Sequence, residues 1–243
     1  MRFLSVHNAN FTKWKFRYFI REFTIFMESD ILMKFIDIEN WKRKDHYNFF
    51  KSFNYPHFNI CGNVDITKFY SYIKENEIPF FISFVYVATK AANDIKEFRY
   101  RIREDKVVEH EYINPAFTVM VQDEVFSFCR AKFINEFNDF KISASEEIDK
   151  IKNNIIIKDE SDCDDLLYMT SIPWVSFTGV AHPIQMNPVD SIPRIAWGKY
   201  FEENGKVKLP LSVQVHHALV DGLHVGQYFS VIQEILDNPS KYL

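Results

Sequence analysis

The sequence predicts an α/β fold, in the form of an α+β two-layer sandwich in which a mixed β-sheet is packed with helices. Three observations lead to this prediction. The chain has 243 residues, of which 47% are hydrophobic and 26% charged, which is enough for one domain with a full hydrophobic core. Segments rich in β-branched or alternating apolar residues stand beside segments whose apolar residues recur at helical intervals. These strands and helices do not alternate regularly, as they would in repeated βαβ units.

The start of the domain is predicted at Met33, so that residues 33–243 form a single domain and residues 1–32 an N-terminal extension. Residues 11–27 place aromatic side chains among lysines and arginines, the pattern of an amphipathic helix. Two explanations of the extension stay open. It is an artefact of the assigned translation start, which we favour, or it packs on a partner or a membrane surface.

The first half of the domain is expected to be mostly helical. Asp65 is a candidate N-cap, because its side-chain oxygen can accept a hydrogen bond from the first turn of a helix. The segment after Pro79 is apolar on most of its faces, which predicts a buried helix. In order, the expected elements are a helix over 39–53, an extended segment over 60–64, and helices over 65–77 and 80–95.

Strands are expected to dominate the second half. Asn204 and Gly205 are a strong signal for a tight hairpin turn between two of them. The acidic stretch at 154–165 is expected to be a solvated loop. The expected strands are 106–110, 117–122, 125–133, 166–177, 192–201 and 206–215, with helices at 133–153 and 221–236.

Charge, hydropathy and cysteine content exclude several classes of protein. The net charge of −4 argues against a nucleic-acid binder, which usually has a basic surface. No apolar run approaches the roughly 18 residues of a membrane span. The three cysteines are odd in number and form no C-x-x-C pair, which indicates a reducing compartment, the cytoplasm.

The densest group of reactive side chains lies in LSVQVHHALVDGLHVG, at 211–226. Histidine can take up and return a proton near neutral pH, so His216 or His217 is a candidate general base. Neighbouring residues of a strand face opposite ways, and one of the pair is therefore expected to be structural. Three alternatives stay open: a core histidine, a purely capping role for Asp221, and a metal site that includes His224. The spacing matches no common zinc pattern, which weakens the last.

The segment PLSVQVHHALVDGLHVGQYF closely resembles the active-site segment of the chloramphenicol acetyltransferase family, whose signature is His-His-x-x-x-Asp-Gly. Three further segments, FIDIENWKRKDHY, NPAFTV and TSIPWVSF, resemble the family's start, its central strand and its serine-bearing strand. The resemblance runs from Met33 to the C-terminus.

The resemblance assigns roles residue by residue. His217 falls on the general base, whose second ring nitrogen the family holds with a backbone carbonyl. Asp221 and Arg43 fall on an ion pair that braces the site. Thr170 stands for the serine whose hydroxyl donates to the oxyanion. Phe49, Phe50, Phe126 and Arg194 fall on substrate-binding positions of the pocket.

Besides Thr170, which is a conservative departure, three positions depart from the family pattern. Phe50 replaces a tyrosine that touches substrate, Ala196 replaces a threonine, and Arg194 replaces an aliphatic residue. We expect Arg194 to pair with Asp190, four residues earlier, because a buried guanidinium needs a carboxylate or several acceptors. The pocket would then stay mostly apolar.

The resemblance implies an acetyl-CoA-dependent O-acetyltransferase, with chloramphenicol as the expected acceptor and antibiotic resistance as the outcome. Acetyl-CoA would be the co-substrate, no metal would take part, and transfer would be direct in a ternary complex. It also implies a cytoplasmic homotrimer with each site at a subunit interface, and a small hydroxylated acceptor rather than a nucleic acid or membrane. The alternatives are the same fold with a different acceptor, a non-catalytic small-molecule binding trimer, and a metal-dependent hydrolase.

Overall fold

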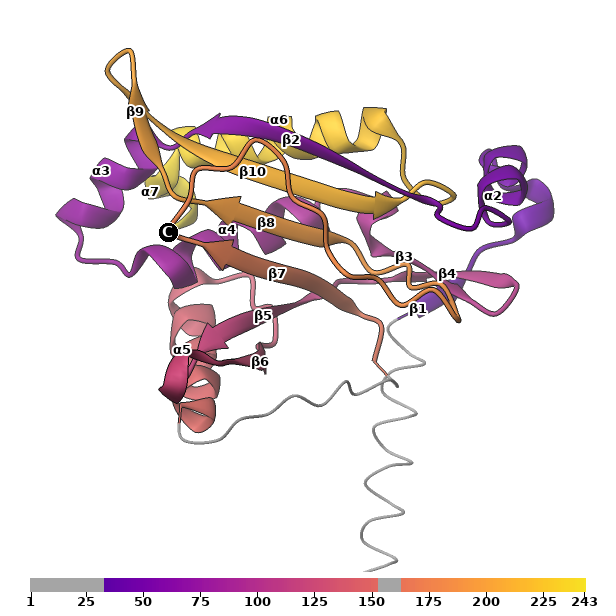
Figure 1. The fold of residues 1–243 in the computed structure, drawn as a ribbon, viewed down its shortest axis with the longest axis horizontal. Helices are drawn as coiled ribbons and strands as arrows, with labels where there is room; N and C mark the ends of the chain where they lie inside the picture. The colour runs from indigo at the N-terminus through magenta and orange to yellow at the C-terminus, as the bar shows by residue number, and fades with distance from the viewer. Residues whose placement is uncertain (1–32, 153–162) are drawn as a thin grey trace, which may run out of the picture.

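The computed structural model describes residues 33–152 and 163–243. The predicted extension at 1–32, with its amphipathic helix, and most of the predicted loop at 154–165 lie outside these residues. Within them, a seven-stranded mixed sheet runs in the order β2-β10-β8-β7-β5-β6, with β9 pairing β10, and a three-stranded sheet runs β1-β4-β3. The predicted mixed sheet packed with helices is confirmed (Figure 1).

The elements follow in chain order. The strands are β1 (Met33–Phe35), β2 (His57–Asp65), β3 (Tyr100–Arg103), β4 (Lys106–His110), β5 (Asn114–Met120), β6 (Phe126–Arg130), β7 (Leu166–Ile172), β8 (Arg194–Gly198), β9 (Phe201–Glu203) and β10 (Lys206–His216). The α-helices are α2 (Lys44–Phe50), α3 (Thr67–Glu75), α4 (Phe80–Asn93), α5 (Phe137–Ile151), α6 (Gly222–Asp237) and α7 (Pro239–Tyr242). Short 3-10 helices occur at Ile38–Asn40, Lys96–Arg99 and Gln122–Glu124.

Helices cover one face of the large sheet and leave the other to the candidate site. Helix α4 is buried along most of its length, as its apolar sequence predicts, and its Phe84 packs on Trp197 of β8 with the ring centroids 5.0 Å apart. In α6, Tyr228 donates a hydrogen bond to the carbonyl of Ala88. Figure 1 shows both helices behind the sheet, whereas the segment at 173–193 crosses in front of it. Side chains that alternate with the core residues of β5, β7 and β8 therefore face this segment.

The turn of the hairpin between β9 and β10 is formed by two residues that adopt positive φ angles readily. Asn204 and Gly205 have φ angles of 52° and 74°, the left-handed conformation that a two-residue hairpin turn requires at both positions. The hairpin leads into β10, which pairs with β2 on one side and β8 on the other. The prediction of this turn is confirmed, and it places the histidine motif at the far end of the longest strand.

Several predicted boundaries were wrong. The helix predicted over 39–53 is divided into a 3-10 turn and the seven-residue α2. The strand predicted over 166–177 ends at Ile172, before Pro173, and the one predicted from 192 begins after Pro193. Proline has no backbone N–H to donate to a sheet, which explains both ends.

The predicted N-cap role of Asp65 was also wrong in its details. Asp65 is the last residue of β2, and the N-cap position of α3 is Ile66. The Asp65 carboxylate nevertheless accepts hydrogen bonds from the backbone N–H and the hydroxyl of Thr67, at 3.0 and 2.6 Å. Asp65 therefore accepts a hydrogen bond from a backbone N–H of the first turn of α3, as an N-cap would, although it lies one residue before the N-cap position.

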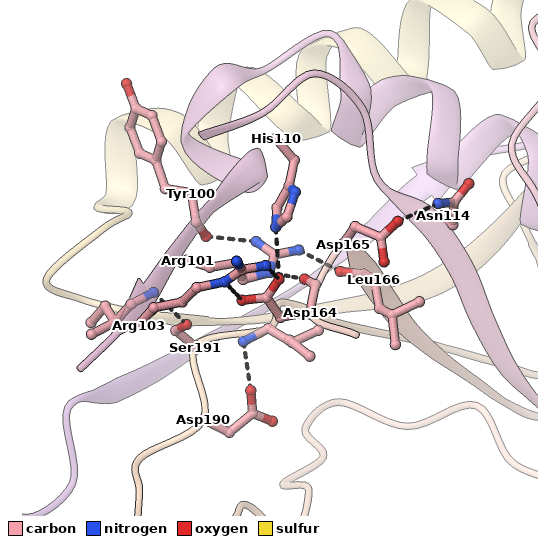
Figure 2. A network of polar contacts seen from close by, with 12 residues as sticks. Tyr100, Arg101, Arg103, His110, Asn114, Asp164, Asp165, Leu166, Asp190 and Ser191 are labelled. Atoms are coloured by element: carbon pink, nitrogen blue, oxygen red, sulfur yellow. Dashed lines mark hydrogen bonds and ion pairs between the residues drawn. The ribbon is translucent and has the colours of Figure 1, made fainter. Parts of the chain in front are cut away.

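At the described end of the acidic stretch before β7, Asp164 and Asp165 accept hydrogen bonds from other segments (Figure 2), whereas Cys163 is exposed. Asp164 accepts hydrogen bonds from Arg103 Nε and Nη2 at 2.8 and 2.7 Å, and its Oδ1 lies 2.8 Å from His110 Nε2. The fully buried Arg101 donates to backbone carbonyls on both sides, including those of Asp164 and Leu166. Burial would raise the pKa of Asp164, but the bonds from Arg103 and His110 hold it well below its ordinary value. This network ties the small sheet to the start of β7.

Candidate active site

The two histidines of the motif lie at the end of β10 in different surroundings. His216 is the last strand residue and is 2% exposed, and its Nδ1 accepts a hydrogen bond from the N–H of Ala218 at 3.2 Å. Burial lowers the pKa of His216 to about 3, so that it is neutral at physiological pH. His216 is therefore structural, as expected for one member of the pair.

His217 lies just beyond the strand and is held by aromatic packing. Its backbone N–H donates to the carbonyl of Pro56 at 2.8 Å. Its ring stacks on Phe50 of α2, with centroids 3.9 Å apart and planes 10° apart, and it also contacts Phe58. The Nδ1 atom is buried and has no hydrogen-bond partner among the described residues, so the carbonyl bond that the resemblance implies is not formed there.

Arg43 and Asp221 form the predicted ion pair. Arg43 Nη1 donates to Asp221 Oδ2 at 2.5 Å, and Arg43 Nη2 donates to the backbone carbonyl of His217 at 3.3 Å. Burial raises the pKa of the Asp221 carboxyl, but the hydrogen bond from Arg43, the charges of His224 and Arg43 and the hydrogen bond from the Leu223 N–H together outweigh it, and the net pKa lies below its ordinary value. The guanidinium thus links the carboxylate to the backbone that carries His217.

Asp221 is also the N-cap of α6. Its side chain accepts a hydrogen bond from the N–H of Leu223, and His224 Nδ1 accepts one from the N–H of Asp221, which completes a capping box. Asp221 therefore caps the helix, but the alternative of a purely capping role was wrong, because the same carboxylate also forms the ion pair with Arg43.

The histidines of the motif do not converge on one point. One nitrogen of His216 and one of His224 already accept backbone hydrogen bonds. In residues 33–152 and 163–243, no group of three or more His, Cys, Asp or Glu side chains could hold a metal ion. The metal-site alternative finds no ligand set in this part of the chain.

A pocket of about 380 Å³ opens on the helix-free face of the large sheet. Thr170 of β7 lies in its wall, with its Oγ1 3.0 Å from Oγ1 of Thr118 on β5. The remaining lining residues are Ala116, Phe126, Phe128, Arg130, Tyr168, Met169, His182, Pro183, Gln185, Asp190, Arg194 and Ile195. The wall is thus aromatic and apolar in one part and polar in another.

Arg194 sits in the polar part and is paired as predicted. Its Nη2 donates to Asp190 Oδ2 at 2.5 Å, and its Nη1 donates to the carbonyl of Ile192 at 3.0 Å. The guanidinium carbon lies 5.2 Å from the ring centroid of Tyr168, a cation–π contact. With 8% of its surface exposed, Arg194 is a compensated charge in the pocket wall.

The expected site residues therefore fall into two groups. The His217 cluster consists of Arg43, Phe50, His217 and Asp221, and Phe49 packs on Phe50 beside it with 61% of its surface exposed. The second group, Phe126, Thr170 and Arg194, lies in the wall of the pocket. His217 and Phe49 do not line this pocket.

Sequence reasoning did not single out several residues of the pocket. Thr118, Phe128 and Tyr168 reach it because they alternate with core residues along their strands. His182 reaches it from an irregular segment, where no periodicity marks the direction of a side chain. The one available signal was the dipeptide His182-Pro183, a histidine whose nearest neighbours, Val180, Ala181 and Ile184, are apolar.

Comparison with known proteins places this geometry in a family. Residues 31–233 match the family model described as chloramphenicol acetyltransferase. A chloramphenicol acetyltransferase of Proteus mirabilis is 30% identical over 209 residues, which are 85% of this chain and 95% of the relative. One of Clostridium perfringens is 32% identical over 216 residues, 87% of this chain and 99% of the relative.

Solved structures agree with this assignment. A chloramphenicol acetyltransferase superposes with a TM-score of 0.78 and 28% identity, covering 84% of this chain and all of the other. The dihydrolipoamide acetyltransferase of Azotobacter vinelandii reaches a TM-score of 0.62 at 13% identity, over 82% of this chain and 88% of that one. The second similarity shows a shared fold.

Proposed function

Because this chain belongs to the chloramphenicol acetyltransferase family and is an acyltransferase, we propose that it transfers the acetyl group of acetyl-CoA to a hydroxyl of a small acceptor, with chloramphenicol as the first candidate. The observation that carries the proposal is the Arg43–Asp221 pair, which holds the backbone of His217 by a second hydrogen bond. This arrangement fixes a histidine beside an aromatic wall without using the imidazole itself as a structural partner. Conferring antibiotic resistance would follow if chloramphenicol is the acceptor.

Proton transfer is assigned to His217. Its Nδ1 is buried, which leaves Nε2 as the nitrogen able to meet an acceptor hydroxyl. Neutral Nε2 would remove the hydroxyl proton while the oxygen attacks the thioester carbon of acetyl-CoA. The tetrahedral intermediate would then collapse, with CoA leaving as the thiol and taking the proton from the imidazolium. No covalent enzyme intermediate is needed.

Stabilisation of the oxyanion is assigned to Thr170. Its hydroxyl lies 3.0 Å from that of Thr118. If Thr118 donates to Thr170, the Thr170 proton is free for the negative oxygen of the intermediate. Loss of one such donor typically costs about 10²–10³ in kcat.

The division of the site supports a homotrimer whose active sites lie between subunits. His217 and Thr170 must act on the same substrate, yet His217 is absent from the lining of the pocket that holds Thr170. Large apolar side chains are exposed at both places, including Phe49 at 61% and Phe126 at 44%. A second copy that brings its His217 cluster to this pocket would complete the site and cover these surfaces. Size-exclusion chromatography with light scattering tests this, and a monomer with full activity would contradict it.

A cytoplasmic location is part of the proposal, since acetyl-CoA is a cytoplasmic metabolite in the expected reaction and the three cysteines are unpaired. Among the helices that the structure describes, none is long and apolar enough to cross a membrane.

The proposal is tested by thiol release from acetyl-CoA with a panel of acceptors that includes chloramphenicol. We expect thiol release that depends on an acceptor and an acetylated product detected by mass spectrometry. Tight binding of an acceptor without thiol release would favour the non-catalytic binding trimer. Turnover of other acceptors but not of chloramphenicol would favour the same chemistry with a different acceptor.

The second candidate, a different acceptor, has a specific observation in its favour. Asp190 and Arg194 place an ion pair in the pocket wall, and His182 and Gln185 add further polar atoms. A pocket with a polar part accommodates acceptors that a uniformly apolar pocket would reject.

A further inference from the structure

The third histidine of the motif, His224, has no part in the reaction proposed above. It is the third residue of α6, and 13% of its side chain is exposed. Its Nδ1 atom lies 3.1 Å from the backbone nitrogen of Asp221 and also 3.1 Å from Oδ1 of the same residue. His224 therefore touches the residue that joins the cap of α6 to Arg43.

Glu97 faces the other ring nitrogen of His224. Its Oε1 lies 3.6 Å from His224 Nε2, longer than a direct hydrogen bond, so the carboxylate acts on the ring by its charge. Glu97 belongs to the 3-10 helix Lys96–Arg99, in which the neighbouring Phe98 stacks on Tyr228 of α6 with the ring centroids 5.0 Å apart. Both rings are fully buried. Core packing thus holds the carboxylate beside His224.

The two neutral tautomers of the His224 ring bind Asp221 in different ways. With the proton on Nε2, the ring directs an N–H toward Glu97, and Nδ1 accepts the hydrogen bond from the N–H of Asp221. With the proton on Nδ1, that bond is lost, and the ring would donate to Asp221 Oδ1, which already accepts from the N–H of Leu223. The negative charge of Glu97 favours the first tautomer, because it attracts the proton on Nε2.

His224 is neutral near physiological pH, so its tautomer decides how it binds. Burial lowers the pKa of His224, and the carboxylates of Glu97 and Asp221 oppose this effect. The charges of Arg43 and Lys96 lower the pKa again, and the net pKa lies below its ordinary value. The lone pair of Nδ1 therefore remains available to the N–H of Asp221.

Asp221 connects His224 to the candidate base. Its carboxylate accepts a hydrogen bond from Arg43 Nη1 at 2.5 Å, and Arg43 Nη2 donates to the backbone carbonyl of His217 at 3.3 Å. The capping box holds the backbone of Asp221, and with it the direction of the carboxylate. Loss of the bond to His224 would free the N–H of Asp221 and let the carboxylate turn away from Arg43.

We propose that His224 is a positioning residue for His217 and that the Glu97 carboxylate selects the tautomer in which it acts. The effect reaches His217 through Asp221 and Arg43. This inference rests on the proposed function, because it assumes that His217 carries out the proton transfer. It differs from a simple helix cap, which needs an acceptor at position 224 but has no need of Glu97.

Two substitutions of His224 measure the positioning. His224→Leu removes the acceptor, whereas His224→Gln keeps one, since glutamine at the third position of a helix completes a capping box. One neutral hydrogen bond corresponds to roughly tenfold in an equilibrium constant. With acetyl-CoA and chloramphenicol, we expect kcat to fall about tenfold in His224→Leu, because fewer molecules hold His217 in place. The KM for chloramphenicol should stay unchanged, and His224→Gln should recover most of kcat.

Asn238→Ala is the matched control at the other end of the same helix. Asn238 is the C-cap of α6, and its side chain donates to the carbonyl of Glu234 at 2.9 Å. Its removal weakens α6 far from Asp221, so the free energy of unfolding should fall while kcat is unchanged. Equal losses of kcat in Asn238→Ala and His224→Leu would make His224 a general stabiliser of the helix and overturn the proposal.

Glu97→Gln tests the selection of the tautomer. The amide has the size of the carboxylate, but it can donate to Nε2 or accept from it, and so it favours neither tautomer. We expect a smaller loss of kcat, about threefold, because only part of the molecules leave the active arrangement. A glutamine at position 224 has no tautomers, so adding Glu97→Gln to His224→Gln should leave kcat unchanged. Equal losses in the two backgrounds would remove Glu97 from the proposal.

Amide hydrogen exchange, followed by mass spectrometry with fragmentation to single residues, needs no turnover. The N–H of His217 is bonded to Pro56 and that of Asp221 to His224. Both should exchange about tenfold faster in His224→Leu, but not in Asn238→Ala. Faster exchange at Asp221 with no change at His217 would show a cap that does not reach the base, and would overturn the proposal.

These measurements separate the proposal from the function on which it rests. If neither chloramphenicol nor another acceptor releases thiol, the proposed function fails, whereas hydrogen exchange at His217 still tests His224. Should His224→Leu fail to fold, the effects of Glu97→Gln in the unmodified and the His224→Gln backgrounds decide.

Discussion

The His217 cluster and the pocket that contains Thr170 are built in different ways. The cluster comes from one short motif at the end of β10 together with Arg43, and its single ion pair also caps α6 and holds the backbone of His217. The pocket comes from residues of β5, β6, β7 and β8 and from the segment at 173–193 that crosses the sheet. The pocket wall combines aromatic, apolar and polar side chains from several separate segments. The difference teaches that, in the proposed mechanism, proton transfer and choice of acceptor would be carried by separate parts of the molecule, so that one could change without the other.

The largest effect is expected at the cluster. His217→Ala should lower kcat by about 10²–10⁴, because the general base is lost, while acetyl-CoA still binds. His216→Ala is the control and should lower the free energy of unfolding more than the chemistry, since that ring is buried and bonded to the backbone. Kinetics and urea denaturation measure both. Lost turnover with full stability in His216→Ala, beside an active His217→Ala, would reverse the two roles.

A smaller loss of turnover is expected in the pocket. Thr170→Val keeps the shape of the side chain but removes the hydroxyl, and kcat should fall by about 10²–10³. Thr170→Ser, which restores the hydroxyl, should recover most of the rate. Both variants should keep the affinity for acceptor within a few fold. Equal rates for Thr170→Val and the unmodified protein would remove Thr170 from the mechanism.

Arg194 separates stability from specificity in the pocket. Arg194→Ile leaves the Asp190 carboxylate without its partner, and we expect the free energy of unfolding to fall by about 3 kcal/mol. Because the Arg194 charge is already compensated, the preference among acceptors should be preserved. Adding Asp190→Asn should restore part of the stability. A stable Arg194→Ile that gains chloramphenicol turnover would instead make Arg194 the specificity residue.

The smallest of the four effects is expected for the ion pair of the cluster, which is partly exposed to solvent. Asp221→Ala removes both the helix cap and the partner of Arg43, and should lower the free energy of unfolding by about 2 kcal/mol, with a loss of activity. Asp221→Asn keeps a capping oxygen and should be milder. In a double-mutant cycle with Arg43→Ala, we expect the losses to be less than additive. Strictly additive losses would show that the two residues do not interact in solution.

The pKa of Asp221 adds a pH dependence to the same pair. Its folded-state pKa lies below its ordinary value, so the pair contributes stability above the unfolded-state pKa of an aspartate. This contribution is lost as the pH falls through the lower, folded-state pKa. Acid titration of the unfolding free energy should therefore show a weaker acid dependence in Asp221→Asn than in the unmodified protein.

Local physics accounts for what could be predicted from the residues alone. The apolar segment after Pro79 is the buried helix α4, since only a helix that is surrounded by core can be apolar on most faces. Asn204 and Gly205 form the expected hairpin turn, because few other residues adopt positive φ angles readily. The His-His-x-x-x-Asp-Gly pattern places His217 beyond a strand and Asp221 at a helix start, both positions set by residues within a few places of them.

Other predictions failed where distant residues decide. The stretch before β7 was expected to be solvated because its own residues are acidic, but Arg103 and His110 come from another part of the chain to pair with Asp164. The helix over 39–53 was overestimated because regular spacing of aromatic residues does not show where the chain must turn to reach the sheet.

The sequence by itself determined the fold class, the local placement of the histidine motif, and the expectation that Arg194 pairs with Asp190, because each depends on periodicity or on residues close together in the chain. Only the tertiary structure decided that Thr118 lies beside Thr170, that His217 stands apart from the pocket, and that His182 belongs to its wall. The physical reason is that a pocket wall is made by side chains from separate strands, whose relative positions are set by sheet register and core packing. No short stretch of sequence contains that information.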